Sequence, residues 1–399
     1  MKVRSITAGA NLFLPFDASG FSAVGEFLKL AKEAVSRRGI EVQTTRVAGD
    51  RLNGVLDHHG KGAVAELAAR LDAACRSEGV DLGSIGTLDI AGAYAPTGFA
   101  SELAAAVAQN ERVFASVLAV YPGLEVNYAA VLETARAVLD LSRSSSNGFN
   151  CRRFALGAHI PPDGPFFPSA YHDGGPNAFS IALEAADLAV EAFGKTPELE
   201  LACADLKAAF EERCRPIEEV CLDLAARYGW RYIGMDISPA PFPRPEVSIA
   251  AACEHLGGGP FGSPGTLTAV RTIKRVLKAV ELRKCGFCGV MLPVLEDSVL
   301  ASRVSEGRVT LDQLLHYSAV CGTGLDTIPL PGAASERQLA AVMLDVCTLS
   351  AALNKPLTAR LMPVPGKVAG DRTDFDSPYF GNALIMPLPQ GSMRHFFGD

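Results

Sequence analysis

The chain has 399 residues, of which 48% are hydrophobic, and a formal net charge of −7. This length and composition predict a sizeable buried core in one or two α/β domains. The negative charge and the scattered Lys and Arg residues argue against a nucleic-acid partner. No uninterrupted apolar run reaches the roughly 18 residues of a membrane helix, which argues against a membrane partner.

Helical periodicity recurs along the whole chain. Helices are expected at residues 22–38, 63–77, 127–142, 177–193 and 197–228. Two later helices start with capping-box spacing, Thr310 with Gln313 and Ser335 with Gln338. The polar stretch 143–150 is the best candidate for a flexible connection, but the composition on its two sides is similar, so we predict a single domain over residues 1–399.

About ten apolar segments of strand length separate the helices. They are residues 2–7, 41–47, 84–90, 113–120, 153–158, 231–237, 289–294, 327–330, 358–363 and 383–388. Several lack polar alternation, which indicates strands that are buried on both faces. The pattern predicts an α/β fold and is compatible with an open sheet or with a barrel.

The ten cysteines lie in helical or apolar patterns, which favours buried free thiols over disulfides. Cys285 and Cys288 have redox or zinc spacing, but no second such pair exists and an apolar segment follows them directly. Because residues 1–6 do not have the pattern of a secretory signal, we expect a reducing, cytoplasmic compartment.

Glycines at residues 257–262 satisfy G-x-G-x-x-G but follow a helical segment, which argues against a dinucleotide site. The next turn leads through Gly265 into a helix that starts near Thr266. Free backbone N–H groups there are a candidate anion site, and a simple connecting loop is the alternative.

Residues 158–176 leave a strand and stay irregular, and loops of that length are often functional. His172 in this loop is a candidate acid or base, and His159 a weaker one. Asp236 and Ser238 follow another strand on a backbone stiffened by Pro239 and Pro241.

Two further segments place carboxylates after strand-like or helical segments. Glu296 and Asp297 follow Pro293, and they line a pocket or cap the next helix. The run from Val320 to Pro329 sets the Cys321 thiol and the Asp326 carboxylate on a glycine-bent backbone, where catalytic groups are often found.

These motifs occur in one order. They are Arg4-Ser-Ile-Thr-Ala-Gly9, the loop from Pro165 to His172, Asp236-x-Ser238-x-Ala240-Pro241, Leu292-Pro-Val-x-Glu296-Asp297 and Cys321-x-x-Gly324-Leu-Asp326-x-Ile-Pro329. Together they resemble the uncharacterised-protein family known as domain of unknown function seven hundred and eleven. The resemblance implies a ten-stranded α/β barrel of the pyruvate formate-lyase-like type, with helices outside and a loop entering its centre.

In the radical enzymes with that barrel, a cysteine on the central loop becomes a thiyl radical and a glycine near the C-terminus stores it. The family is not known to carry the radical glycine, and residues 381–387 do not look like its motif. We therefore do not expect a glycyl radical enzyme.

Three hypotheses follow. The first is a non-radical enzyme for a small, anionic metabolite, with Cys321, His172, Asp236 and Asp326 as catalytic groups and Arg4, Ser238, Gly265, Thr266 and Glu296 in substrate binding. The second is a metal-assisted hydrolase or lyase that uses Asp236, Asp326, His172 and His159, although no short spacing indicates a metal site. The third is a non-catalytic small-molecule-binding or assembly protein. The residues name no cofactor and leave a homo-oligomer open.

Overall fold

The computed structural model describes residues 1–60, 62–92, 96–321, 323–391 and 393–397. Its strands form a nine-stranded sheet in the order β7-β6-β1-β2-β3-β4-β5-β9-β8. The strands are β1 (Lys2–Gly9), β2 (Val42–Ala48), β3 (Leu82–Asp89), β4 (Val113–Val120), β5 (Phe154–Ala158), β6 (Ala178–Glu184), β7 (Arg231–Ala240), β8 (Gly324–Pro331) and β9 (Leu357–Val364).

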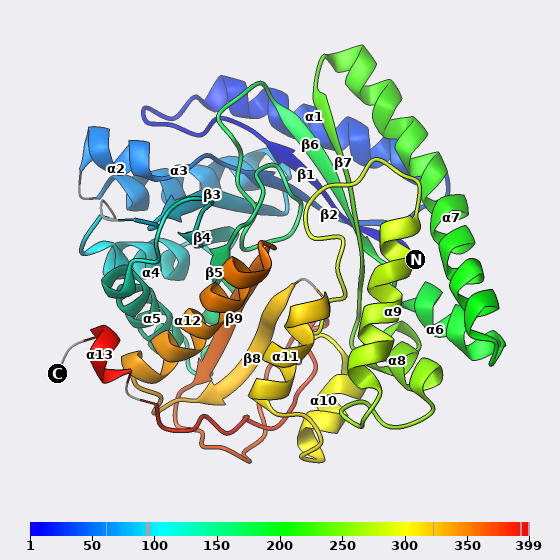
Figure 1. Cartoon of the computed structure of the whole chain (residues 1–399). Helices are drawn as coiled ribbons and strands as arrows, with labels where there is room; N and C mark the ends of the chain where they lie inside the picture. Colours follow the sequence, from blue (N-terminus) through cyan, green and yellow to red (C-terminus); the bar gives the residue numbers. More distant parts are fainter. Residues whose placement is uncertain (61, 93–95, 322, 392, 398–399) are drawn as a thin grey trace.

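Strands β1 to β5 are mutually parallel. A pair of strands flanks this group on each side and runs antiparallel to it. Strand β6 is antiparallel to β1 and parallel to β7, while β9 is antiparallel to β5 and parallel to β8. The sheet therefore consists of a central parallel group and two outer pairs that run the opposite way (Figure 1).

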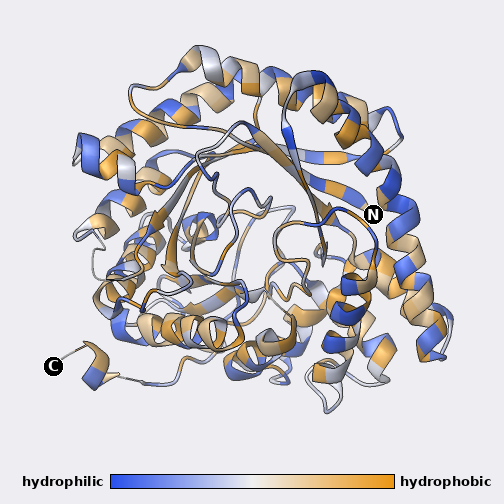
Figure 2. Cartoon of the chain, turned by 45° about the horizontal axis from the view of Figure 1, so that its top comes forward, coloured by the Kyte–Doolittle hydropathy of each residue, from blue (hydrophilic) through white to orange (hydrophobic). Residues whose placement is uncertain are grey.

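Helices lie around the outside of this curved sheet (Figure 1). They are α1 (Ala18–Ser36), α2 (Asn53–His59), α3 (Ala63–Glu78), α4 (Phe99–Gln109), α5 (Tyr128–Arg143), α6 (Ala186–Lys195), α7 (Leu199–Tyr228), α8 (Ile249–Gly257), α9 (Thr266–Ala279), α10 (Ser298–Ser305), α11 (Leu311–Cys321), α12 (Glu336–Leu353) and α13 (Arg394–Phe397). Hydrophilic and hydrophobic residues alternate along them in Figure 2, as expected for helices with one face in water.

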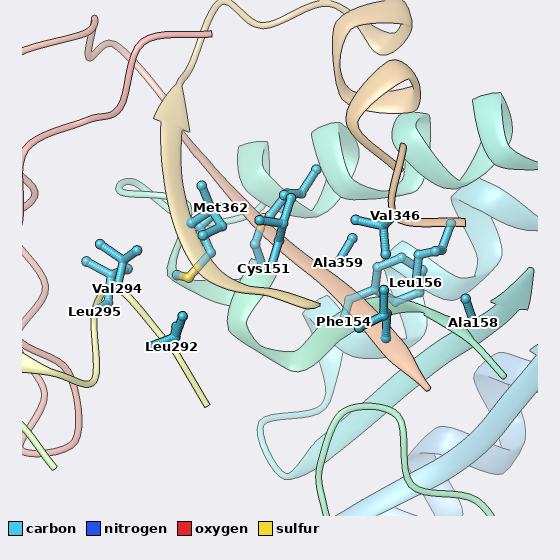
Figure 3. Packing of buried hydrophobic residues seen from close by; sticks show 14 of the residues in the cluster. Cys151, Phe154, Leu156, Ala158, Leu292, Val294, Leu295, Val346, Ala359 and Met362 are labelled. Carbon is cyan, nitrogen blue, oxygen red and sulfur yellow. The ribbon is translucent and has the colours of Figure 1, made fainter. Parts of the chain in front are cut away.

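The hydrophobic core lies between these helices and the sheet, and strand β4 is an example of the resulting burial. All eight of its residues, VFASVLAV, are buried, so this strand has no solvent face. Figure 3 shows the same packing where Phe154 and Leu156 of β5 meet Ala359 of β9 and Val346 of α12. None of the helices in the described ranges is long and apolar enough to cross a bilayer.

The predicted capping boxes are present. Ser335 caps α12 by accepting from the Gln338 N–H, and the Gln338 side chain accepts from the Ser335 N–H. Thr310 and Gln313 make the same pair of bonds at the start of α11. Helix α7 continues through Pro216, as the helix predicted over residues 197–228 requires.

The helix predicted over residues 177–193 is wrong in its first half. Residues 178–184 form β6, which is buried on both faces, and α6 begins only at Ala186. An apolar run of this length fits a strand or a helix equally well, and the neighbouring strands β1 and β7 decide between them.

The count of ten strands is not confirmed, because nine form ladders in the described ranges. Residues 289–294 were expected as a strand but form no ladder. Their segment makes isolated bridges instead, from Lys284 to Met235 of β7 and from Pro293 to Asp326 of β8. Proline lacks the N–H that a regular ladder requires, which accounts for the irregularity at Pro293. Residues 383–388 also form only one isolated bridge, from Arg372 to Leu384. The hydrogen-bonded ladder is not closed into a barrel.

The polar stretch 143–150 is a hydrogen-bonded turn between α5 and β5. Asn150 donates to the Ser144 hydroxyl over 2.9 Å, and the Phe149 N–H donates to Asn147 over 3.2 Å. The chain before this turn contributes β1 to β4 and the chain after it contributes β5 to β9, all in the same sheet.

Candidate anion-binding cavity

A cavity of about 490 Å³ lies among strands from the middle and from both edges of the sheet. Its lining includes residues of β1, β2, β5, β7, β8 and β9, together with loop residues 166–169 and 376–380 and with Phe287, Met291, Pro293 and Glu296. Because β7 and β8 are the two edges of the sheet, this shared lining means that the sheet curves around the cavity (Figure 2). Volumes of this size are typical of small-molecule sites.

One wall of the cavity carries a chain of paired charges. Glu296 is buried, and its two oxygens accept from Arg4 and from Arg360. Arg360 also donates its Nε–H to Oδ1 of Asp326 over 2.6 Å. Burial alone would raise the pKa of Glu296, but the Arg4 and Arg360 guanidinium groups hold it below its usual value.

Local backbone features direct Asp326 into the cavity. The register between β8 and β9 shifts between Leu325 and Ile328, and Thr327 has a φ of 47°, which is rare for a β-branched residue. Leu295 supports Thr327 by donating its N–H to the Thr327 hydroxyl. Gly324 is required here, because its φ is 93° and a Cβ would lie 2.2 Å from the Thr358 carbonyl oxygen.

Arg46 of β2 is the buried cation of the cavity without an acidic partner. Its Nε–H donates to the Thr44 hydroxyl over 3.0 Å, and its guanidinium lies 5.2 Å from the centre of the Phe167 ring. Within the described ranges it forms no ion pair. Burial, and then the nearby Arg4 charge, lower the pKa of Arg46 to about 9.

Arg152 is a second cation of the lining without an ion pair in the described part of the chain. It donates to the Phe149 carbonyl over 3.0 Å and lies 4.1 Å from the centre of the Phe149 ring. Burial, and then the nearby Arg360 charge, lower the pKa of Arg152 to about 10.

The inner surface of the cavity therefore has an excess of positive charge. Its guanidinium groups are those of Arg4, Arg46, Arg152 and Arg360, whereas the carboxylates inside are those of Glu296 and Asp326. Two further aspartates of the lining, Asp81 and Asp376, are exposed at the surface. The Asp81 charge raises the pKa of Arg46, but burial and the Arg4 charge outweigh it. An anion inside the cavity would offset the excess.

The rest of the lining combines small polar and apolar residues with seven aromatic ones. The aromatic residues are Phe114, Phe149, Phe166, Phe167, Phe287, Tyr379 and Phe380. Large apolar walls with a few charged groups are typical of sites for small organic molecules.

Of the four predicted catalytic residues, only Asp326 lines this cavity. Cys321 is the last residue of α11 and is completely buried. The cations near its thiol are Lys274 and Lys355. Burial lowers the pKa of both lysines, whereas the interaction with Cys321 raises it. Gly322, which was part of the predicted Cys321 to Asp326 run, lies outside the described residues.

His172 is buried beneath the loop that joins β5 and β6. Its Nδ1 lies 2.6 Å from Oδ1 of Asp163, and its Nε2 lies 3.0 Å from the Gly175 carbonyl oxygen. Burial lowers the pKa of His172, but these hydrogen bonds and the Asp163 charge outweigh it and leave the pKa raised. Both ring nitrogens are engaged, so His172 anchors its own loop.

The ring of His172 and the carboxylates of Asp163 and Asp173 offer ligand atoms within 4.8 Å of one another, a spacing that suits a metal ion. However, Arg231 donates to Asp163 over 3.2 Å and to Asp173 over 3.0 Å. The guanidinium already supplies the positive charge that a metal ion would bring. His159, the other imidazole of this loop, pairs with Ser350 instead.

Asp236 is fully buried and holds the loop that follows α9. Its oxygens accept from Ser238 and from the N–H groups of Phe287 and Cys288. Burial raises the pKa of Asp236. The Ser238 hydroxyl in turn accepts from the Gly289 N–H. The structure thus joins Asp236 to Ser238, but places both outside the cavity lining.

Among the residues predicted to bind substrate, Arg4 and Glu296 line the cavity, whereas Ser238, Gly265 and Thr266 do not. The Thr266 hydroxyl closes its own turn by donating to the Ser263 carbonyl. Cys285 and Cys288 are partly buried free thiols, and the other cysteines are buried and free.

The model of the family described as "Uncharacterised ACR (DUF711)" matches residues 1–377. The chain belongs to this family. Its relatives include the UPF0210 protein of Pyrobaculum aerophilum, 34% identical over 384 residues that cover 92% of this chain and 84% of the relative. The UPF0210 protein of Desulforudis audaxviator is 29% identical over 425 residues (99% and 91%), and that of Methanopyrus kandleri 28% over 413 residues (97% and 91%). The resemblance inferred from the motifs is confirmed.

Three arginines that line the cavity of this DUF711 protein were not predicted from the sequence as site residues. Arg46 and Arg360 lie within segments that were predicted as buried strands, and Arg152 lies just before one. Charged side chains are almost never fully buried unless they are paired or used, so an arginine inside an apolar strand was the available signal.

Proposed function

We propose that the chain is an enzyme that binds a small anionic metabolite in the cavity and acts on it by acid/base chemistry. Arg46 carries the proposal, because it is a buried guanidinium without an acidic partner in the described residues and it faces a cavity of metabolite size. Burying a charge without a partner is costly, and a bound anion would offset that cost.

Asp326 is the acid/base group that the contacts support best. Its Oδ1 accepts from Arg360, whereas its Oδ2 has no hydrogen bond to any described residue and is not enclosed. Glu296 has both oxygens engaged by arginines and a lowered pKa, so it is suited to positioning rather than to proton transfer. We assign Cys321, His172 and Asp236 positioning roles, because none of the three lines the cavity; Asp236 holds the backbone of Phe287, which does.

We further propose that the sheet belongs to the pyruvate formate-lyase-like barrel type and works without a glycyl radical. Two features support the barrel: the strand order with two opposed outer pairs, and the segment 284–293, which bridges to both edge strands. The cytoplasm stays the predicted compartment.

Anion binding is tested by isothermal titration calorimetry of the full chain with phenylpropionate and with inorganic phosphate. Arg46→Gln should weaken binding by at least about tenfold, since a hydrogen bond to a charged group contributes about 1.5–3 kcal/mol. Arg46→Lys should bind with intermediate affinity, because it keeps the charge but loses the planar fork. Arg37→Gln is the control, because Arg37 directly follows α1 and its side chain is exposed. Equal affinities in all four proteins would refute the proposal.

Catalysis is distinguished from simple binding by incubating the protein with a metabolite extract and following the small molecules by mass spectrometry. The wild type should consume at least one acid that Asp326→Asn does not consume, because the amide cannot take up or release the proton. If ligands bind but none is consumed, the protein is a non-catalytic binder.

A further inference from the structure

The polar groups of the cavity lie on well-separated strands. Arg46 belongs to β2 and Asp326 to β8, which stand well apart in the sheet order, yet both side chains line the same space. A ligand that contacts both side chains would bridge these two strands.

Arg46 and Asp326 make opposite demands on a ligand. The Nη groups of Arg46 have no acceptor among the described residues, so they need an anion or another acceptor. Oδ2 of Asp326 is a carboxylate oxygen without a donor, so it needs a hydroxyl or an amine. The register shift and the unusual Thr327 backbone hold Asp326 in this orientation, which is how strain is commonly used at binding sites.

The form of the anion receptor favours a carboxylate over a phosphate. A single planar guanidinium can bind two oxygens of a carboxylate or of a phosphate, so the groups around it must discriminate between them. Phosphate sites are commonly built on the N–H groups of a helix N-terminus, and the cavity lining contains no first-turn residue of a described α-helix. The aromatic walls add the requirement for an apolar body.

We propose that the ligand of this cavity is a carboxylic acid with an apolar or aromatic body and at least one hydrogen-bond donor, with its carboxylate on Arg46 and its donor on Asp326. This inference rests on the proposed function and names its substrate class. Arg46 and Asp326 then determine specificity together, and the chain of charges through Arg360, Glu296 and Arg4 positions Asp326.

Calorimetry with four probes tests this inference. Phenylpropionate has the carboxylate and the ring but no further hydrogen-bond donor. Phenyllactate adds a hydroxyl next to the carboxylate, and para-hydroxyphenylpropionate adds one at the far end of the ring. Phenyl phosphate carries a phosphate in place of the carboxylate. One of the two hydroxylated acids should bind at least about tenfold tighter than phenylpropionate, as expected for a hydrogen bond to a charged oxygen.

The variants separate the two contacts. Asp326→Asn should remove the advantage of the hydroxylated acid and leave phenylpropionate within about twofold of the wild type, which also shows that the variant is folded. Arg46→Gln should weaken all three carboxylic acids. Asp223→Asn is the control, since Asp223 pairs with Arg227 on the outer surface of α7.

The outcomes distinguish failure of this inference from failure of the proposed function. If phenyl phosphate binds tighter than every carboxylic acid, or if the hydroxyl gives no advantage that Asp326→Asn removes, the substrate class is overturned while anion binding stands. If no probe binds, or if Arg46→Gln binds all of them as the wild type does, the proposed function fails as well.

Discussion

Arg360 donates from Nη2 to Oε1 of Glu296 over 2.6 Å, and both side chains are buried. Arg4 occupies the other oxygen of Glu296, so one carboxylate joins β1 to β9 across the cavity wall. Buried charges of this kind are stable only as a complete set, because each desolvated charge depends on its partners.

We expect Glu296→Gln to lower the free energy of unfolding by about 3–5 kcal/mol, since it leaves two guanidinium groups without their shared anion. Urea denaturation measures the change. Glu33→Gln is the control and should change stability by less than about 1 kcal/mol, because its pair with Arg37 is exposed. A loss for Glu296→Gln no larger than that of the control would contradict a stabilising role for this network.

Stability should decrease as pH rises above the ordinary histidine range, because of His172. Its pKa is raised in the folded state, so its contribution is fully present below the unfolded pKa of about 6.5 and is lost as pH rises through the higher folded pKa. Urea denaturation of the wild type at a series of pH values above about 6 should show this loss.

His172→Gln should flatten that pH dependence, whereas His58→Gln, at an exposed position, should not change it. Asp163, Asp173 and Arg231 also face this site, and their charges remain in both variants. An unchanged slope in His172→Gln would show that His172 does not titrate in this window.

Gly324→Ala should destabilise the fold more than Gly39→Ala does. Both glycines have positive φ, at 93° and 77°, but a Cβ on Gly324 meets the Thr358 backbone at 2.2 Å while a Cβ on Gly39 meets nothing within 4 Å. We expect a loss of about 1 kcal/mol for Gly39→Ala from backbone strain alone and a clearly larger loss for Gly324→Ala. Thermal unfolding compares the two, and similar losses would show that the β8 backbone adjusts to the added methyl group.

Cys321→Ser should leave the affinity for phenylpropionate within about twofold of the wild type, because Cys321 does not line the cavity. Titration with a thiol reagent should leave Cys321 unmodified in the folded protein, since it is completely buried. Rapid modification of Cys321 that also abolished ligand binding would show that its thiol belongs to the binding site.

Local signals predicted well those features that depend on a few neighbouring residues. The capping boxes at Thr310 and Ser335 appear as expected, because a cap requires only the next three residues. Residues 178–184 were misassigned because an apolar run does not say whether strands will lie beside it.

The candidate site shows the same division. Asp326, Glu296 and Arg4 were expected in a pocket, each within or beside a strand-like segment, and they line the cavity. Cys321 and Asp236 carry similar signals but do not line the cavity, since Cys321 ends helix α11 and Asp236 faces the backbone of Phe287 and Cys288. The shift between Leu325 and Ile328 could be seen only once β8 was paired with β9.

The order of motifs was sufficient to place the chain in its family, and the apolar periodicity was sufficient for an α/β fold with buried strands. Both signals are local, because each depends only on residues that are close together in the sequence. Only the tertiary structure revealed the charge network and the unpaired Arg46. The members of the network come from segments far apart in the sequence, as with Arg4 and Glu296, which are 292 residues apart, and only the curvature of the sheet brings them to one cavity.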